Sequence, residues 1–143
     1  MKIVQLKSAD ARICSEINSL LRQLSSSAQT GKCSPKLLKR IVESEESELW
    51  VALDKRRTVG MATLAIIVKP GGMVARVEDV VVDASARGQG LGAAITKKLI
   101  ERAKAHKAKL VLLSSRPSRV AANALYKKLG FKLHKTNTYQ MKL

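Results

Sequence analysis

The sequence predicts one domain of the α/β (α+β) class, with a mixed, mostly antiparallel sheet of six to seven strands flanked by about four helices. Three observations lead to this prediction. A glycine-rich turn joins an apolar strand to an amphipathic helix, a hairpin pattern precedes that strand, and 143 residues with 45% hydrophobic content can form one substantial core. We therefore expect a single domain over residues 1–143, without internal repeats.

The N-terminal part predicts a short strand followed by two helices. Alternation favours a strand over Lys2–Leu6, and Ser8 can cap a helix whose apolar residues recur on one face. Those apolar residues are Ile13, Ile17, Leu20, Leu21 and Leu24. The polar run 25–32 predicts a loop, where a substrate lid could lie. Ser34 followed by Pro35 has the form of a helix cap and first turn, and predicts the second helix.

Three neighbouring strands follow, and we expect them to pair antiparallel. Leu49–Leu53 and Thr58–Val68 flank a short polar turn, which is typical of a hairpin. Pro70-Gly71-Gly72 then turns the chain into a strand over Met73–Asp83. The later predicted elements are a helix from Gly90, a strand over Lys109–Ser115, a helix from Pro117 to Leu129 ended by Gly130, and closing strands over Phe131–Lys135 and Thr138–Leu143.

The turn Arg87-Gly88-Gln89-Gly90-Leu91-Gly92 predicts an anion site. Glycines allow the backbone to approach a ligand closely, and the first turn of the following helix presents unpaired N–H groups. Arg87 adds a fixed positive charge whose geometry suits phosphate. We interpret this turn as the binding site of a pyrophosphate.

Two families use such a turn. Gly88-x-Gly90-x-x-Ala93 fits the dinucleotide-binding fingerprint, but that fold needs an acidic residue about 20 positions later. The next predicted strand ends in serines instead, and too little chain follows for the rest of that fold. Arg-Gly-x-Gly-x-Gly at the start of a long helix resembles the acetyl-CoA pyrophosphate loop of the GNAT superfamily of N-acetyltransferases.

A second segment carries the same resemblance. Residues 123–131, Asn-Ala-Leu-Tyr-Lys-Lys-Leu-Gly-Phe, are similar to the family's last-helix signature, and the order of predicted elements matches the family over the whole chain. The resemblance implies acetyl-CoA (coenzyme A) as co-substrate and no metal. It also implies that the strand before the turn bulges and splays from its neighbour, which leaves the main chain of Val80 and Val82 for contacts to the cofactor. The pyrophosphate contacts that it implies come from Arg87, Gly88, Gln89, Gly90, Leu91, Gly92 and Ala93.

The resemblance also suggests a general acid. Tyr126 occupies the position where many family members place it, and a phenol with a pKa near 10 stays protonated at pH 7. Packing on the cofactor without a proton role is the alternative. Asn123 lies one turn earlier and is a candidate contact to the cofactor. Many members carry an asparagine seven residues before the tyrosine, where this chain has Arg119.

The base is less clearly marked. Glu78 and Asp79 lie in mid-strand, so regular alternation would send them to opposite faces of the sheet. By its offset from Arg87, Glu78 matches a catalytic position in some relatives, and the Glu-Asp pair resembles glucosamine-6-phosphate N-acetyltransferases. We favour Glu78, acting directly or through water; the alternative is a structural acid paired with Arg76 or another basic residue. A glutamate that some relatives carry on the following strand is replaced here by Ser114.

Composition argues against several other functional classes. No apolar run approaches the roughly 20 residues needed to span a bilayer, and no signal peptide is apparent, so a cytoplasmic protein without membrane contact is expected. Cys14 and Cys33 have no metal-site spacing and are expected to be reduced. The net charge is +16, with twelve basic and seven acidic residues in 1–70 and fifteen and four in 71–143. Nucleic acid is the sharper alternative partner, but only four aromatic residues are available for stacking.

The functional hypothesis is an acetyl-CoA-dependent N-acetyltransferase, an acyltransferase that moves an acetyl group directly to a primary amine of a small molecule or peptide. The alternative is a GNAT-fold binding module whose basic face holds nucleic acid or a protein partner; a homodimer is left open. The charge favours a neutral or anionic acceptor over a lysine-rich tail. An acidic rim formed by Glu43, Glu45, Glu46 and Glu48 would argue for the opposite preference.

Overall fold

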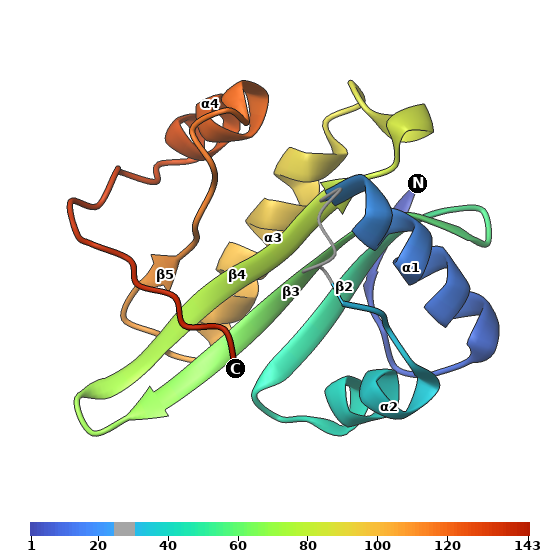
Figure 1. The fold of residues 1–143 in the computed structure, drawn as a ribbon, viewed down its shortest axis with the longest axis horizontal. Helices are drawn as coiled ribbons and strands as arrows, with labels where there is room; N and C mark the ends of the chain where they lie inside the picture. Colours follow the sequence, from blue (N-terminus) through green and yellow to red (C-terminus); the bar gives the residue numbers. More distant parts are fainter. Residues whose placement is uncertain (25–30) are drawn as a thin grey trace.

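The structure is a computed structural model that describes residues 1–24 and 31–143 (Figure 1). Most of the run predicted as a loop and lid, residues 25–30, lies outside the described residues. The elements in chain order are β1 (Lys2–Gln5), α1 (Ala11–Leu24), α2 (Pro35–Glu43), β2 (Ser47–Asp54), β3 (Arg57–Lys69), β4 (Gly72–Val82), a 3₁₀ turn (Ala84–Ala86), α3 (Leu91–Ala105), β5 (Val111–Leu112) and α4 (Val120–Lys128).

The sheet is mixed and its strands follow the order β1-β2-β3-β4-β5. The first four strands pair antiparallel, and β5 pairs parallel with β4 after the crossover through α3. Helices α1 and α2 cover one face of the sheet and α3 covers the other, while α4 lies beyond β5 (Figure 1). This arrangement confirms the α+β class and the predicted antiparallel hairpins.

The two faces of the sheet form two core layers, because successive side chains of a strand point to opposite faces. Val51 and Met61 face α1 and α2, whereas the next residues, Ala52 and Ala62, face α3. The layer under α3 is centred on Ile95 and Leu99, which are fully buried. Small alanines on that face let α3 pack closely on the strands.

Of the two helix caps predicted from the sequence, one is present in the structure. The main-chain N–H of Leu37 donates to Ser34 Oγ at 3.1 Å, which confirms the cap of α2. The cap expected from Ser8 is wrong, because the helix begins later and Asp10 Oδ1 accepts from the N–H of Ile13 at 2.8 Å. Aspartate serves as well as serine in this role.

A buried carboxylate joins β2 to the C-terminal part of α3. Glu48 is 5% exposed and accepts hydrogen bonds from Arg102 Nη2 at 2.7 Å, Arg102 Nε at 3.0 Å and Trp50 Nε1 at 2.8 Å. His106 Nε2 lies 2.7 Å from Glu48 Oε1, the oxygen that also accepts from Arg102 Nη2. Placing Glu48 in an exposed acidic rim was therefore wrong: its charge is buried and paired.

The C-terminal part departs from the prediction. The strand expected over Lys109–Ser115 contains only Val111 and Leu112 in ladder pairing, and residues 131–143 contain no strand. The described sheet thus has five strands, so six to seven was wrong, whereas the expected number of helices, four, is confirmed. Alternation alone cannot make a strand, and the two-residue β5 offers almost no edge to extend.

The last helix ends as the sequence indicates. Gly130 has φ +100°, and the N–H of Phe131 donates to the carbonyl of Tyr126 at 3.0 Å, which closes the helix C-terminus. The two cysteines are free thiols, with 3.8 Å between Cys14 Sγ and Cys33 Sγ. None of the helices described is long and apolar enough to span a membrane.

Candidate active site

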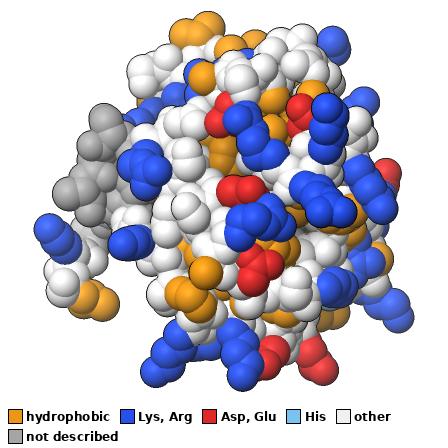
Figure 2. All heavy atoms as spheres, turned by 90° about the vertical axis from the view of Figure 1, so that its right-hand side faces the viewer, with side chains coloured by type: hydrophobic (Ala, Val, Ile, Leu, Met, Phe, Trp, Pro, Cys, Tyr) orange, Lys and Arg blue, Asp and Glu red, His pale blue; other side chains and the backbone are white. Residues whose placement is uncertain are grey.

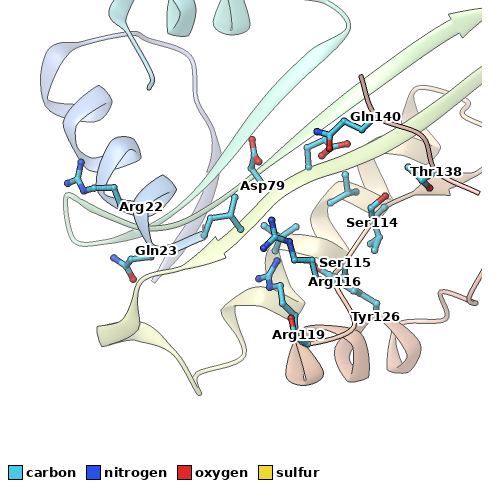
Figure 3. A pocket seen from close by; sticks show the side chains of 16 residues that line it. Arg22, Gln23, Asp79, Ser114, Ser115, Arg116, Arg119, Tyr126, Thr138 and Gln140 are labelled. Carbon is cyan, nitrogen blue, oxygen red and sulfur yellow. The ribbon is translucent and has the colours of Figure 1, made fainter. Parts of the chain in front are cut away.

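A cleft of about 990 Å³ opens between β4 and the segment that follows β5 (Figure 3). The end of α1 contributes Arg22, Gln23 and Leu24, and β4 contributes residues 77–80. The opposite wall consists of residues 113–116, Ser118, Arg119 and Tyr126, with Thr138 and Gln140 from the C-terminal segment. Three elements far apart in the sequence therefore converge on the middle of β4.

A β-bulge lies at the centre of this cleft. In the register with β3, Met61 pairs with Val81 and Thr63 pairs with Glu78, so Asp79 and Val80 together lie opposite one residue. Asp79 has φ +54°, a left-handed conformation that is uncommon outside glycine. The expectation that Glu78 and Asp79 point to opposite faces is wrong, because the bulge interrupts the alternation and both line the cleft.

The edge of β4 beyond the bulge is not paired with β5. The described pairing between these strands covers only Ala75 with Val111 and Arg76 with Leu112. At the far end of β4, the N–H of Asp83 donates to the carbonyl of Val59 on β3, at 2.8 Å. Main-chain groups alternate along a strand, so those of Val82 face away from β3, toward the gap, while the bulge interrupts this alternation at Val80.

The glycine-rich turn lies where this edge ends. Gly88 and Gly90 have φ +78° and +75°, and a Cβ built on either would meet nothing within 4 Å. Gly90 is the N-cap of α3, and its carbonyl accepts the first helical hydrogen bond, from the N–H of Ala94. The N–H groups of the first turn therefore point outward, and the open space over the glycines lets a ligand approach them.

The chain matches the family described as "Acetyltransferase (GNAT) family" over residues 16–131. This match covers the bulge, the glycine-rich turn and α4. The chain belongs to the GNAT acetyltransferase family. A crystal structure of an acetyltransferase from Trypanosoma brucei is 30% identical, with a TM-score of 0.77 and 99% of each chain covered.

Two curated relatives match the chain over shorter segments. A rice protein (Oryza sativa subsp. japonica) named "Probable glucosamine 6-phosphate N-acetyltransferase 2" is 48% identical over 61 residues, which are 43% of this chain and 35% of the relative. A "Glucosamine 6-phosphate N-acetyltransferase" from Trypanosoma brucei brucei is 40% identical over 81 residues, 54% of this chain and 53% of the relative. The matched segments thus span about a third to a half of these relatives.

The residues of this GNAT chain fit the acetyl-CoA that the family implies. The open space above Gly88 and Gly90 leaves room for a pyrophosphate, and the unpaired edge at Val80 and Val82 leaves main-chain groups for an extended arm. Arg87 Nε donates to the carbonyl of Val82 at 3.0 Å, so this arginine also ties the turn to β4. The side chain of Leu91 is buried in the core, which leaves only its main chain for the ligand.

Tyr126 lies in the cleft wall as the GNAT signature suggests. Its side chain is 7% exposed and packs edge-on against Phe131, with 5.9 Å between the ring centroids. Burial raises the pKa of Tyr126, and the positive charge of Arg119 opposes this rise. The phenol therefore keeps its proton at neutral pH, as a proton donor must.

The two carboxylates of the bulge have different surroundings. Glu78 Oε1 accepts from Arg76 Nε at 2.8 Å, and Arg76 Nη2 donates to Ser114 Oγ at 3.3 Å. The pairing of Glu78 with Arg76 is the alternative that the sequence left open. Among the described residues, the hydrogen bonds and ion pairs include none to the Asp79 carboxylate, and its pKa is raised by burial and by the neighbouring charge of Glu78.

Asn123 holds the segment before α4 in place. Its amide nitrogen lies 2.9 Å from the carbonyl oxygen of Arg116, 2.8 Å from that of Arg119 and 3.4 Å from Ser115 Oγ. The cofactor contact expected from Asn123 stays a prediction. These bonds shape the loop that presents Arg116 and Arg119 to the cleft (Figure 3).

The basic residues of the cleft have no recognisable pattern in the sequence. Arg22, Arg116 and Arg119 all line it, although they belong to two segments almost a hundred residues apart. Only Arg119 carried a signal, as a departure from the family pattern. Of the residues described, no group of three or more His, Cys, Asp or Glu side chains is placed to hold a metal ion.

Proposed function

We propose that this chain is an N-acetyltransferase that moves an acetyl group from acetyl-CoA directly to a primary amine. The acceptor we propose is a small molecule that also carries an anionic group, such as glucosamine 6-phosphate. One arrangement carries the proposal: the glycine-rich turn follows β4, the edge of β4 beyond the bulge is not paired with β5, and the cleft at the bulge contains Tyr126 and two carboxylates.

The residues of the chain divide the work of such a transfer. Acetyl-CoA supplies the acetyl group as a thioester. The turn from Arg87 to Ala93 binds the pyrophosphate, and the main chain of Val80 and Val82 orients the arm toward the bulge. Tyr126 donates a proton to the leaving thiolate, and a carboxylate of the bulge accepts a proton from the attacking amine.

The charges in the cleft support an acceptor with an amine at one end and an anion at the other. Glu78 and Asp79 attract an ammonium group, while the guanidinium groups of Arg22, Arg116 and Arg119 suit a phosphate. Both curated relatives are named for glucosamine 6-phosphate, which carries these two groups. A lysine-rich tail would meet three arginines in the same cleft.

A binding module without catalysis is the second candidate, favoured only by the net charge of +16. Figure 2 shows one face on which Lys and Arg side chains are spread out, with Asp and Glu among them. A nucleic-acid site would be expected to gather its basic residues in a stripe. This face shows no such stripe.

Free-thiol release from acetyl-CoA tests the proposal. The purified chain is incubated with acetyl-CoA and glucosamine 6-phosphate, glucosamine, or a lysine-rich peptide, and the acetylated product is identified by mass spectrometry. We expect turnover that depends on the amine and is greatest with glucosamine 6-phosphate. A chain that binds acetyl-CoA but acetylates none of these amines would contradict the proposed activity.

A further inference from the structure

Asp79 differs from Glu78, the other acid of the cleft, in its backbone conformation and in its surroundings. We propose that Asp79, and not Glu78, is the catalytic base that accepts the proton of the acceptor amine; this inference rests on the proposed function. It replaces Glu78, which the offset from the glycine-rich turn had favoured. Geometry, hydrogen bonding and local charge each support it.

The geometry singles out the residue that the bulge reorients. Asp79 and Val80 share one partner on β3, and Asp79 takes φ +54° to make this possible. Such a conformation costs a non-glycine residue on the order of 1–2 kcal/mol, and strain of this kind clusters at active sites. A regular strand would place residues 78 and 79 on opposite faces, so the strained backbone is what brings the Asp79 carboxylate into the cleft.

Hydrogen bonding separates the two carboxylates. Glu78 is already held by Arg76 at 2.8 Å, and Arg76 is in turn held by Ser114. If Glu78 took up a proton, it would lose its charge and with it the ion pair to Arg76. The Asp79 carboxylate accepts no hydrogen bond and forms no ion pair with any residue that the structure describes, so its oxygens remain available for a substrate amine (Figure 3).

The charges facing Asp79 favour reversible protonation. Burial and the negative charge of Glu78 raise its pKa. The other charged or titratable groups of the cleft are Arg22 from α1, Arg116 and Arg119 from the opposite wall, and Tyr126 from α4. The two carboxylates attract the ammonium form of the acceptor, and the raised pKa gives Asp79 a greater affinity for the proton than an aspartate without these neighbours has.

The transfer removes two protons from the acceptor nitrogen. The acceptor enters as R–NH₃⁺ and gives one proton to an Asp79 carboxylate oxygen, which frees the nitrogen lone pair. A C–N bond forms to the acetyl carbonyl carbon and the C–S bond breaks. Tyr126 gives its proton to the departing thiolate and is reprotonated by the second proton that leaves the nitrogen. Asp79 then releases its proton to water, so the products are the amide, the free thiol and one H⁺.

The matched variants Asp79→Asn and Glu78→Gln test this assignment. Asparagine also tolerates positive φ, so Asp79→Asn keeps the bulge while removing the base. We expect Asp79→Asn to lower kcat/KM by roughly 10²–10⁴-fold and to abolish the loss of activity at acidic pH. Glu78→Gln should keep that acidic limb, shifted to lower pH because the charge of Glu78 is gone. Both variants should keep the rise in Tm that acetyl-CoA produces.

A second readout does not depend on turnover. The chain has four aspartates, so ¹³C-carboxyl NMR of aspartate-labelled protein gives four signals, and the signal missing in Asp79→Asn identifies Asp79. We expect its titration midpoint above the ordinary aspartate value in the wild type, and lower in Glu78→Gln. If the wild type is active and Asp79→Asn keeps full activity, the role of Asp79 is overturned while the proposed function stands. A wild type that binds acetyl-CoA but acetylates no amine would overturn the proposed function and this role with it.

Discussion

Three carboxylates of this chain show how neighbouring groups set the pKa of an acidic side chain. Burial opposes the charged form of Glu48, but hydrogen bonds from Arg102, His106 and Trp50 outweigh it and lower its pKa to about 2. Hydrogen bonds from Ser85 and Gln23 likewise lower the pKa of Asp83 to about 2. Asp79 lacks such donors among the described residues, and its pKa is raised instead. Glu48 therefore has a structural role, because it joins β2 to α3, whereas the carboxylate of Asp79 is available for proton transfer.

Tyr126→Phe tests the proton donor at the residue scale. The substitution removes only the hydroxyl and keeps the ring that packs on Phe131. We expect kcat to fall by roughly 10²–10⁴-fold, because the thiolate then leaves without its acid. The Tm shift produced by acetyl-CoA should be unchanged, since the glycine-rich turn is intact. A variant that keeps the full kcat would reduce Tyr126 to a packing role.

Glu48→Gln tests the buried ion pair through the pH dependence of stability. The folded-state pKa of about 2 lies below the ordinary value of 4.5, so the unfolded chain takes up the proton first as the pH falls. The stabilisation is therefore present above about pH 4.5 and is lost between pH 4.5 and 2. We expect Glu48→Gln to lower the free energy of unfolding by about 1–3 kcal/mol at pH 7. The difference from wild type should shrink toward pH 2.

Glu101→Gln is the matched control for Glu48→Gln. Glu101 is an exposed acid on α3, the helix that carries Arg102, and pairs with Lys98, so its loss removes the same charge without opening a buried network. Urea denaturation at several pH values measures both variants. An equal effect of the two substitutions at pH 7 would contradict the buried pair as a source of stability.

At the scale of the element, the sequence predicted what depends on local pattern. The turn 87–92 was recognised because glycines at two alternate positions permit the positive φ that Gly88 and Gly90 adopt. The resemblance to the GNAT family implied a bulge in β4 but did not place it at Asp79, since an aspartate at positive φ leaves no mark that distinguishes it from one in a regular strand. The cleft residues on α1 were missed because their position depends on tertiary contacts, among them the bond of 3.0 Å from Gln23 to Asp83.

The C-terminal segment shows the opposite error. Apolar residues alternate at Tyr139, Met141 and Leu143, which is the pattern of a half-buried strand. In the structure these side chains are largely exposed, and no strand forms after α4. A strand exists only through a partner edge, and a pattern within the segment does not say whether that edge is present.

Gly90→Leu tests the turn as an element, with Gly130→Leu as the matched control. Both glycines have positive φ and open space around the missing Cβ, so both substitutions should cost about 1–2 kcal/mol of backbone strain. Only Gly90 caps α3, and we expect only its substitution to abolish the Tm shift produced by acetyl-CoA. Differential scanning fluorimetry with and without acetyl-CoA measures this. An unchanged shift in Gly90→Leu would remove the turn from the site.

At the scale of the whole molecule, the charge is distributed unevenly relative to the cleft. None of Glu43, Glu45, Glu46 and Glu48 lines the cleft, so no acidic rim surrounds it. Its lining has three arginines and two acids, and the half of the chain that carries most of the lining has fifteen basic and four acidic residues. The field over the cleft should therefore draw anions in and repel polycations.

Acceptor preference tests this field. We expect kcat/KM to be highest for glucosamine 6-phosphate, lower for glucosamine and lowest for a lysine-rich peptide at low salt. Because salt screens exposed charges beyond about 10 Å at 0.1 M, the advantage of the phosphorylated acceptor should shrink at high salt. Arg119→Gln should raise KM for glucosamine 6-phosphate and leave KM for glucosamine nearly unchanged, whereas Lys39→Gln, a surface control on α2 away from the cleft, should change neither. If the lysine-rich peptide is preferred at low salt, Glu78 and Asp79 outweigh the three arginines, and acceptor choice follows the carboxylates of the bulge rather than the positive field.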